Sequence, residues 1–273
     1  MQENKNLELN AAAIEKLCDG AAREVDIEVV AETGSTNADL MARLSAGTGT
    51  GTSPPARPVL RVAVHQTAGR GRAGRPWLTV PGGMLTFSLA WHLPQAPHNL
   101  LGLPLAIGVA LAECLNALNQ NVQLKWPNDI LRDGKKLAGI LLESAAASEG
   151  GTWIVAGIGL NLQVSDELEA QVGRALADAP WLAQMDRNLL LAQLLNALAA
   201  ALQQFGKQGF SVFLPRWNAL HAYAGQTVHI LDHGQVLHTG KALGVDLHGC
   251  LVLQTEQGQV NVLAGDVSLR PVA

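Results

Sequence analysis

The chain has 273 residues, 48% of them hydrophobic and 15% charged, a composition typical of a folded protein with a substantial core. The formal net charge of −4 provides no strong positive field, so a nucleic-acid or anionic-membrane partner is not expected and any basic site must be local. The three cysteines are far apart in the sequence and form no CxxC pair, which argues against a disulfide framework or a thiolate metal site.

The N-terminal segment "MQENKNLELN" lacks a basic region followed by an apolar one, so we expect no secretion signal and a cytoplasmic location. The most apolar stretch, "LLLAQLLNALAAALQQF" at 189–205, is interrupted by Gln and Asn. We therefore expect it to form a buried helix rather than a membrane span.

The first half of the chain predicts alternating helices and strands. We expect helices over 8–20 and from 35 to 44, with strands over 25–32, 59–65 and 84–91. The segment 45–58 is rich in Gly, Thr and Pro and is expected to be a surface loop of no assigned role.

The second half begins with an expected helix over 100–118 and a strand over 122–126. A hairpin turning at Asp133 and Gly134 follows, because this dipeptide readily adopts positive φ angles, and then a strand over 152–162. Helices are expected over 186–206 and 209–222. Short strands separated by turn residues follow from about Gly225.

These elements predict an α+β fold with a mixed or antiparallel sheet flanked by helices, and the hairpin argues against a doubly wound parallel sheet. We expect two domains, 1–224 and a small β-barrel-like domain over 225–273.

The first candidate site is the stretch "HQTAGRGRAGRPW" at 65–77. Its glycines let backbone amides face a ligand, while Arg70, Arg72 and Arg75 offer permanently charged groups for phosphate or carboxylate. A solvated surface loop would use the same residue types. The stretch is not a P-loop, because no Gly-Lys-Ser/Thr follows.

The second candidate is "KWPNDILRDGKKLAGILLE" at 125–143. Asn128 and Asp129 present an amide and a carboxylate where a strand ends, although the same pair is common in turns. Lys136 follows the hairpin turn, where it either is an edge charge or points inward at an anion.

Weaker candidates are Asn161 in "GIGLN" and the residues Ser35, Thr36 and Asn37, which also suit a helix cap. No spacing of His, Asp or Glu matches a metal site, and no metal ligand is assigned.

Five motifs occur in one order: "STN" at 35–37, "GRGRAGRPW" at 69–77, "KWPND" at 125–129, "KLAGIL" at 136–141 and "GIGLN" at 157–161. In this order they resemble the biotin protein ligases, over essentially residues 30–270. The resemblance implies a class II synthetase-like catalytic fold with a small C-terminal SH3-like barrel. It also implies a two-step reaction. Biotin and Mg-ATP form biotinyl-5′-AMP, which then acylates a lysine of a biotin carboxyl carrier protein.

The resemblance also implies roles for individual residues. Lys136, Arg72, Asp129 and Asn128 would be catalytic. Biotin would be bound by Ser35, Thr36, Asn37, Gln66, Gly69, Arg70, Arg72, Lys136 and Gly139. ATP and the adenylate would be bound by Arg72, Arg75, Trp77, Asn128, Lys136, Asn161 and Trp181. ATP, Mg²⁺ and biotin are thus the expected small-molecule partners, and the arginine-rich loop is expected to close over biotin.

Some members of this family carry an N-terminal helix-turn-helix domain, and the 34 residues before Ser35 offer no room for one, so regulation through DNA is not expected. The alternatives are a lipoate or octanoate ligase or transferase of the same fold, a protein that binds biotinyl-adenylate without catalysis, and RNA binding through the arginines. Edge strands beside the loop would allow a homodimer.

Overall fold

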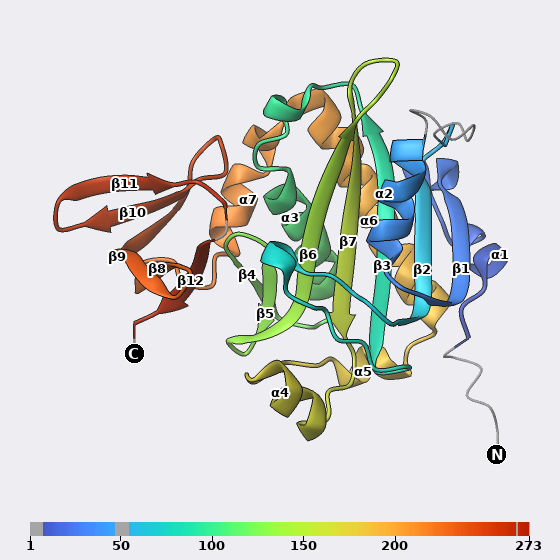
Figure 1. Cartoon of the computed structure of the whole chain (residues 1–273), viewed down its shortest axis with the longest axis horizontal. Helices are drawn as coiled ribbons and strands as arrows, with labels where there is room; N and C mark the ends of the chain where they lie inside the picture. Colours follow the sequence, from blue (N-terminus) through green and yellow to red (C-terminus); the bar gives the residue numbers. More distant parts are fainter. Residues whose placement is uncertain (1–7, 47–54, 266, 273) are drawn as a thin grey trace.

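The computed structural model describes residues 8–46, 55–265 and 267–272. Most of the expected loop at 45–58 lies outside the described residues. A seven-stranded sheet with helices on both faces forms the larger part of the molecule, and a five-stranded sheet forms the C-terminal part (Figure 1).

The strand order of the larger sheet is β1-β2-β3-β7-β6-β5-β4. The first two strands pair in parallel and all other neighbours are antiparallel, so the expected mixed sheet is confirmed. The strands are β1 (Asp26–Thr33), β2 (Val59–Gln66), β3 (Met84–Leu93), β4 (Val122–Lys125), β5 (Asp129–Arg132), β6 (Lys135–Ala146) and β7 (Thr152–Asn161). The β5–β6 hairpin turns at Asp133 and Gly134, with φ of 51° and 73°, as the sequence predicts.

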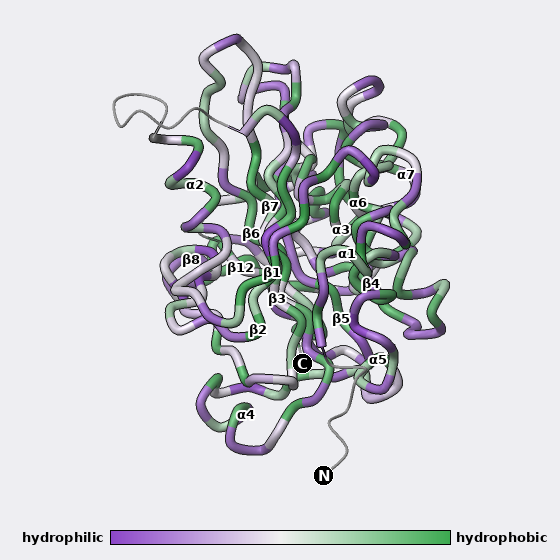
Figure 2. The backbone as a smooth tube through the Cα atoms, turned by 90° about the vertical axis from the view of Figure 1, so that its right-hand side faces the viewer, coloured by the Kyte–Doolittle hydropathy of each residue, from purple (hydrophilic) through white to green (hydrophobic). Residues whose placement is uncertain are grey.

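Two long helices, α3 (Leu103–Ala117) and α6 (Arg187–Gln208), pack in the main core on one face of this sheet. α6 begins at the cap residue Asp186, whose carboxylate accepts hydrogen bonds from two backbone amides. Its apolar window is long enough to cross a membrane, but 56% of that window is buried inside the fold, as the sequence analysis expects. In Figure 2, where the tube is coloured by the hydropathy of each residue, the segments of hydrophobic residues are concentrated in the centre of the molecule.

The opposite face of the sheet is covered in part by α2 (Thr36–Ala46), whose Leu40 and Leu44 pack against Val59, Ala90 and Val155. Side chains alternate between the two faces of a strand, so Thr86 and Ser88 of β3 share the face of Ala90. The polar residues of the site therefore lie on the α2 face, away from the main core.

The sequence analysis is wrong about several helix boundaries. The helix expected over 8–20 is only α1 (Ala11–Glu15), followed by a 3-10 helix (Gly20–Glu24) that starts at a glycine with φ of 47°. The helix expected over 209–222 is a 3-10 turn (Phe210–Val212) and then α7 (Leu214–Ala219). α1 ends at Glu15, well before Gly20, and Gly209 is the residue that ends α6. α7 begins only at Leu214, where Pro215 suits the first turn of a helix.

Two short helices follow β7 that the sequence analysis does not assign, α4 (Asp166–Val172) and α5 (Pro180–Gln184). The signals for α4 are present in the sequence. Ser165 caps its first turn, and Gly173 ends it in the left-handed conformation.

The C-terminal sheet has the antiparallel order β11-β10-β9-β8-β12. Its strands are β8 (Thr227–Asp232), β9 (Gln235–Val245), β10 (Leu251–Thr255), β11 (Gly258–Val262) and β12 (Val267–Pro271). Its apolar residues continue the main core, and the Trp126 indole donates to the carbonyl of Gly249 at 3.1 Å. The two parts therefore pack directly against each other, which lets the C-terminal part contribute to a cavity between them.

Candidate active site

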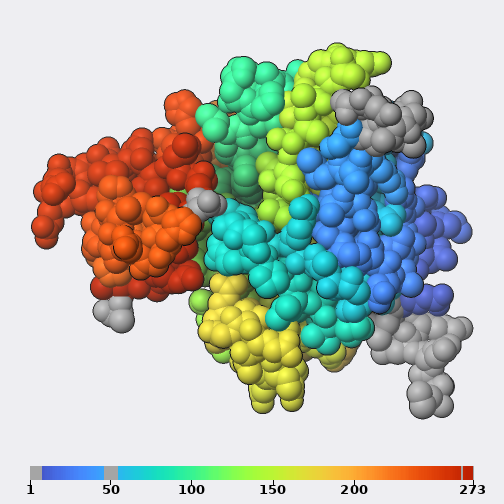
Figure 3. Space-filling model, in the orientation of Figure 1, coloured from blue at the N-terminus to red at the C-terminus, as the bar shows by residue number. Residues whose placement is uncertain are grey.

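The arginine-rich loop after β2 folds as a tight hairpin on the α2 face of the sheet. In Figure 3 the cyan to teal segment that contains this loop lies between α2 and the C-terminal part. The amide of Gly71 donates to the carbonyl of Arg75 at 2.7 Å, and that of Trp77 donates to Gly69 at 2.8 Å. The turn uses positive φ angles at Ala73 and Gly74. A Cβ on Gly69 would lie 2.4 Å from the Trp77 carbonyl, so this close pairing requires glycine.

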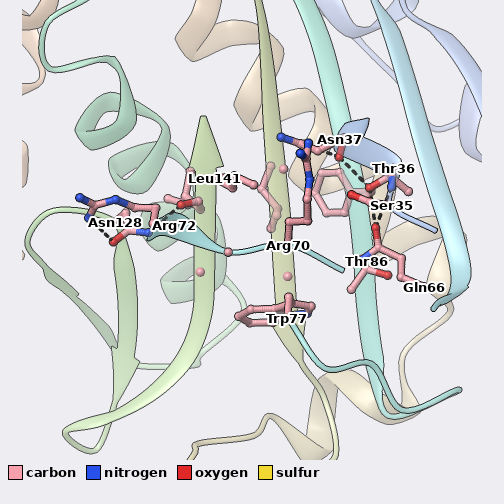
Figure 4. Close-up of a pocket in the computed structure, with 18 of the residues that line it drawn as sticks. Ser35, Thr36, Asn37, Gln66, Arg70, Arg72, Trp77, Thr86, Asn128 and Leu141 are labelled. Atoms are coloured by element: carbon pink, nitrogen blue, oxygen red, sulfur yellow. Dashed lines mark hydrogen bonds between the residues drawn. The ribbon is translucent and has the colours of Figure 1, made fainter. Parts of the chain in front are cut away.

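Beneath this loop is a cavity (Figure 4) whose inner end is lined by neutral hydrogen-bonding groups. Gln66 accepts hydrogen bonds at its Oε1 from the amide of Thr36 at 2.8 Å and from its hydroxyl at 3.0 Å. The Thr36 and Ser88 hydroxyls are 2.7 Å apart, and Ser88 donates to Asn37 Oδ1 at 2.7 Å. All four side chains are buried, so this end of the cavity is suited to a polar, uncharged ligand group.

The floor of the cavity depends on three glycines on β6 and β7. A Cβ on Gly159 would lie 2.2 Å from the Trp77 ring, and one on Gly139, its partner across the strands, would lie 2.8 Å from Lys136 Nζ. A Cβ on Gly157 would lie 2.4 Å from Asn37 Oδ1. Only glycine at these positions lets the indole and the two polar side chains approach the sheet.

At the outer end of the cavity, Lys136 forms a buried ion pair with Asp129, and each side chain is only 14% exposed. Its ammonium also lies 5.4 Å from the centroid of the Trp77 ring. Burial alone would raise the pKa of Asp129, but the charge and hydrogen bond of Lys136, together with the charges of Lys125 and Arg174, outweigh burial and lower the pKa. Burial lowers the pKa of Lys136, and Asp129 opposes that effect. The carboxylate therefore keeps a buried cation beside the cavity.

A second cavity adjoins the first and is lined by cations. Six basic side chains and a single carboxylate, Asp129, are among the described residues that line it. The basic residues are Arg72, Arg75, Lys125, Lys136, Arg174 and Arg270. Burial lowers the pKa of Lys125 to about 8, and the charges of Arg270 and Arg174 act in the same direction. Such a concentration of positive charge favours a polyanion such as a triphosphate.

Four residues line both cavities and therefore mark their junction: Gly71, Arg72, Asn128 and Lys136. Arg72 donates to Asn128 Oδ1 at 3.0 Å and to the carbonyl of Gly265 in the C-terminal part. The amide of Asn128 donates to the carbonyl of Ile140 at 2.7 Å. A ligand that reaches from one cavity into the other must pass these groups.

Most residues predicted from the sequence meet at these cavities. The first is lined by Ser35, Thr36, Asn37, Gln66, Arg70, Arg72, Trp77, Asn128, Lys136 and Gly139, and the second by Arg72, Arg75, Asn128, Asp129 and Lys136. The expectation that Ser35 caps a helix also holds, since its Oγ accepts from the amide of Ala38.

Two predicted adenylate ligands do not line either cavity. Asn161 is buried, and its amide donates to the carbonyls of Lys136 at 3.2 Å and Ala177 at 3.1 Å, so it holds the backbone beside the lysine. Trp181 lies on α5 with 71% of its surface exposed. Gly69 shapes the loop without lining the first cavity.

The sequence analysis missed residues that the fold brings to the site. Thr86 and Ser88 line the first cavity, and the signal for them was two polar residues on the same face of an apolar strand. Lys125 belongs to a motif that was recognised, but it was given no role. Arg174 and Arg270 follow no local pattern and reach the second cavity only through tertiary packing.

Comparison with known proteins agrees with this geometry. The family model described as "Biotin/lipoate A/B protein ligase family" matches residues 46–161, and "Biotin protein ligase C terminal domain" matches 223–270. The chain is 35% identical over 247 residues to the biotin--[acetyl-CoA-carboxylase] ligase of Mycobacterium tuberculosis, covering 88% of each protein. The chain belongs to the biotin protein ligase family. The family and fold class predicted from the sequence are confirmed.

Other biotin protein ligases show the same likeness. The bifunctional ligase/repressors BirA of Salmonella typhimurium and Escherichia coli are 36% and 34% identical, and the chain spans 66% and 65% of their lengths. The biotin protein ligase from Aquifex aeolicus, solved in complex with biotin and ATP, superimposes with a TM-score of 0.73. That match has 28% identity and covers 90% of this chain and 99% of the other.

Proposed function

We propose that the protein joins biotin to ATP, forming biotinyl-5′-AMP and pyrophosphate, and then transfers biotin to a lysine of a biotin carboxyl carrier protein with release of AMP. The observation that carries this proposal is that a cavity with a neutral, hydrogen-bonding inner end joins a cationic cavity at Lys136, Arg72 and Asn128. Biotin has an uncharged ureido head and a carboxylate tail, and ATP supplies the polyanion.

In the first step the biotin carboxylate oxygen forms a bond to the α-phosphorus, and the bond from that phosphorus to the departing pyrophosphate breaks. The ureido head would lie against Thr36, Gln66 and Ser88, which directs the carboxylate to the junction. Lys136 would hold the two anions together, because an ammonium between a carboxylate and a phosphate offsets their repulsion. Asp129 keeps that ammonium charged and in place until the substrates arrive.

The remaining cations would neutralise the phosphates. Arg75 and Lys125 lie in the second cavity, where they can stabilise the charge that develops on the pyrophosphate. Arg72 lies at the junction and would contact the biotin carboxylate first and the acyl phosphate afterwards. Trp77 would shield the mixed anhydride from water.

Mg²⁺ would enter as part of the Mg-ATP substrate. Asp129 is the only carboxylate that lines the second cavity among the described residues, and it is already paired with Lys136. No described cluster of three His, Cys, Asp or Glu side chains forms a metal site. These residues fit a metal held chiefly by the phosphates of ATP rather than by a resident protein site.

In the second step the ε-amine of the carrier lysine would attack the acyl carbon of the adenylate, and AMP would leave. For this the arginine-rich loop must leave the acyl group accessible while it retains the adenylate, which is the closing role that we propose for it. Free Cys18, Cys114 and Cys250 support the proposed cytoplasmic location. A homodimer stays a prediction that sedimentation velocity can test.

A lipoate or octanoate ligase is the main alternative. Four buried polar side chains at the inner end of the cavity disfavour it, because an aliphatic chain or a dithiolane would offer no partner for the hydrogen-bonding capacity that remains beyond their mutual bonds. A protein that only binds the adenylate is the other alternative.

Exchange of labelled pyrophosphate into ATP distinguishes these functions. Biotin, lipoate and octanoate are compared in parallel with wild-type protein and with Lys136→Ala. We expect exchange with biotin alone and its loss in the variant. Exchange only with lipoate or octanoate would assign the protein to the sister activity, and no exchange with any acid would contradict adenylation.

A further inference from the structure

The carboxylate of Glu143, on β6, joins the arginine-rich loop to the inner end of the first cavity. The guanidinium of Arg70 donates to its two oxygens at 3.1 and 2.8 Å, and Asn37 Nδ2 donates to Oε2 at 2.7 Å. The side chain is 29% exposed, so it is partly shielded from water. It is assigned no role in the proposed reaction and does not line either cavity.

This carboxylate fixes which way the Asn37 amide points. An ionised carboxylate only accepts hydrogen bonds, so it must face the NH₂ group of Asn37. The amide oxygen of Asn37 is therefore turned toward Ser88, which donates to it at 2.7 Å. If Asn37 were flipped, its oxygen would face the carboxylate and its NH₂ group would face Ser88.

The opposite end of the network is also an acceptor. Gln66 Oε1 accepts a hydrogen bond from the backbone amide of Thr36 at 2.8 Å, so the oxygen of Gln66, and not its NH₂ group, faces Thr36. The Thr36 and Ser88 hydroxyls thus stand between two fixed acceptors. Three contacts join these four groups, from Gln66 to Thr36, from Thr36 to Ser88 and from Ser88 to Asn37.

Two hydroxyls carry two protons, and a proton can serve only one of these contacts at a time in a full hydrogen bond. One of the three contacts therefore always lacks a donor. The network has a surplus of lone pairs, and a buried acceptor without a donor is costly. A ligand group that brings N–H donors relieves this deficit, whereas a purely apolar group does not.

We propose that Glu143 is a positioning residue that sets this polarity, making the hydroxyl network at the inner end of the first cavity short of donors and selective for a ligand head with N–H groups. The inference rests on the proposed function, in which that head is the ureido group of biotin. Through Arg70 the same carboxylate also anchors the loop above the cavity. Glu143 thereby connects recognition of the head to the position of the loop.

The test is Glu143→Gln, which keeps the size of the side chain but can present either oxygen or NH₂ to Asn37. Glu149→Gln, at an exposed position in the turn between β6 and β7, is the matched control. Biotin and biotin methylated on a ureido nitrogen are titrated calorimetrically into wild type and both variants, and pyrophosphate exchange and thermal unfolding are recorded in parallel.

We expect Glu143→Gln to weaken biotin binding at least tenfold. The methylation penalty is the Kd for methylated biotin divided by the Kd for biotin. It should be large in wild type and in Glu149→Gln, and at least fivefold smaller in Glu143→Gln. At saturating biotin, kcat and the KM for ATP should stay within about twofold of wild type. Glu143→Asp should restore part of the affinity, and Arg70→Gln, which spares the contact with Asn37, should leave the penalty for methylation unchanged.

Unchanged biotin affinity in Glu143→Gln would overturn the inference. An equal methylation penalty in all the proteins would also overturn it. A joint loss of kcat, ATP affinity and thermal stability in Glu143→Gln would overturn it too, because that result would indicate a merely structural role. Binding of biotin by wild type without pyrophosphate exchange would contradict the proposed function while the binding data still tested this inference. Failure of wild type to bind biotin would overturn both.

Discussion

The two cavities of the site differ in how they hold charge. The inner end of the first cavity is lined by neutral side chains that hydrogen-bond to one another, while the second cavity gathers six basic side chains around one carboxylate. Recognition in the first depends on matching donors with acceptors, which is directional and insensitive to salt. Recognition in the second depends on charge, which acts over a longer range and is screened by ions. The proposed chemistry would take place where the two kinds of recognition meet.

Substitution at the junction of the two cavities is expected to have the largest effect on catalysis. Lys136→Met should lower the rate of pyrophosphate exchange by about 10²- to 10³-fold, the range found when one group that stabilises transition-state charge is removed. Biotin binding, measured by calorimetry, should weaken less than about tenfold, because the head is held elsewhere.

Two further proteins control for trivial causes of that loss. Lys135→Met removes an exposed lysine next in sequence and should be nearly silent. The double variant Lys136→Met/Asp129→Asn avoids leaving a buried carboxylate unpaired. If the double variant recovered full exchange, the role given to Lys136 would be refuted.

The next-largest effect distinguishes the role of the first cavity from that of the second. Gln66→Leu removes the acceptor of the Thr36 amide and hydroxyl and should raise the KM for biotin by about 10- to 100-fold, as expected for about 1–3 kcal/mol of lost or unsatisfied hydrogen bonding. The KM for ATP should not change. Steady-state exchange with each substrate varied in turn measures both, and an equal rise in the two constants would show that the cavities are not independent.

The pH dependence of ATP binding provides a smaller effect. Burial lowers the pKa of Lys125 to about 8, so its charge in the free protein is lost as the pH rises through 8. Bound ATP favours the charged form, so the complex retains more protons than the free protein above pH 8. The Kd for ATP should therefore rise about five- to tenfold between pH 7.5 and 9.

Lys125→Arg should make that profile flat, because arginine stays charged throughout this range. Calorimetric titration of Mg-ATP at several pH values measures both proteins. A wild-type profile as flat as that of the variant would exclude Lys125 as a phosphate ligand.

The smallest effect on catalysis concerns the connection between the two parts of the molecule. His221 lies just before the C-terminal sheet, is 4% exposed and packs against Trp217 in a tilted ring contact, with ring centroids 4.8 Å apart. Burial lowers the pKa of His221 to about 4. The unfolded chain therefore binds this proton first, and stability is lost as the pH falls from about 6.5 to 4, by about 3 kcal/mol in all.

Urea unfolding of wild type and His221→Leu between pH 7.5 and 4.5 tests this. The variant should lose less stability over that range, and its kinetic constants at neutral pH should match those of wild type. Parallel stability curves for the two proteins would mean that His221 is not the group that titrates.

Local sequence determined much of this protein. The Asp133-Gly134 turn, the helix from about residue 186 and the strand over β3 follow from rules that act within a few residues, and they were predicted. The helix expected over 209–222 was wrong in its bounds: Gly209 ends α6, residues 210–212 form a 3-10 turn, and α7 begins only at Leu214, where Pro215 suits the first turn. The order of five motifs indicated the family, and the fold then gathered most of their residues around two adjoining cavities.

Tertiary structure alone decided the rest. The loop after α4 carries Arg174 and is held beside Lys136 by a backbone hydrogen bond from Ala177 to the Lys136 carbonyl. Arg270 lies on β12 and reaches the same cavity only because the C-terminal sheet packs on the larger part. Packing likewise directs the side-chain amide of Asn161 to the backbone carbonyl of Lys136 and leaves Trp181 exposed on the surface. Short-range rules describe what a residue can do, whereas the direction and partners of its side chain depend on residues far away in the chain.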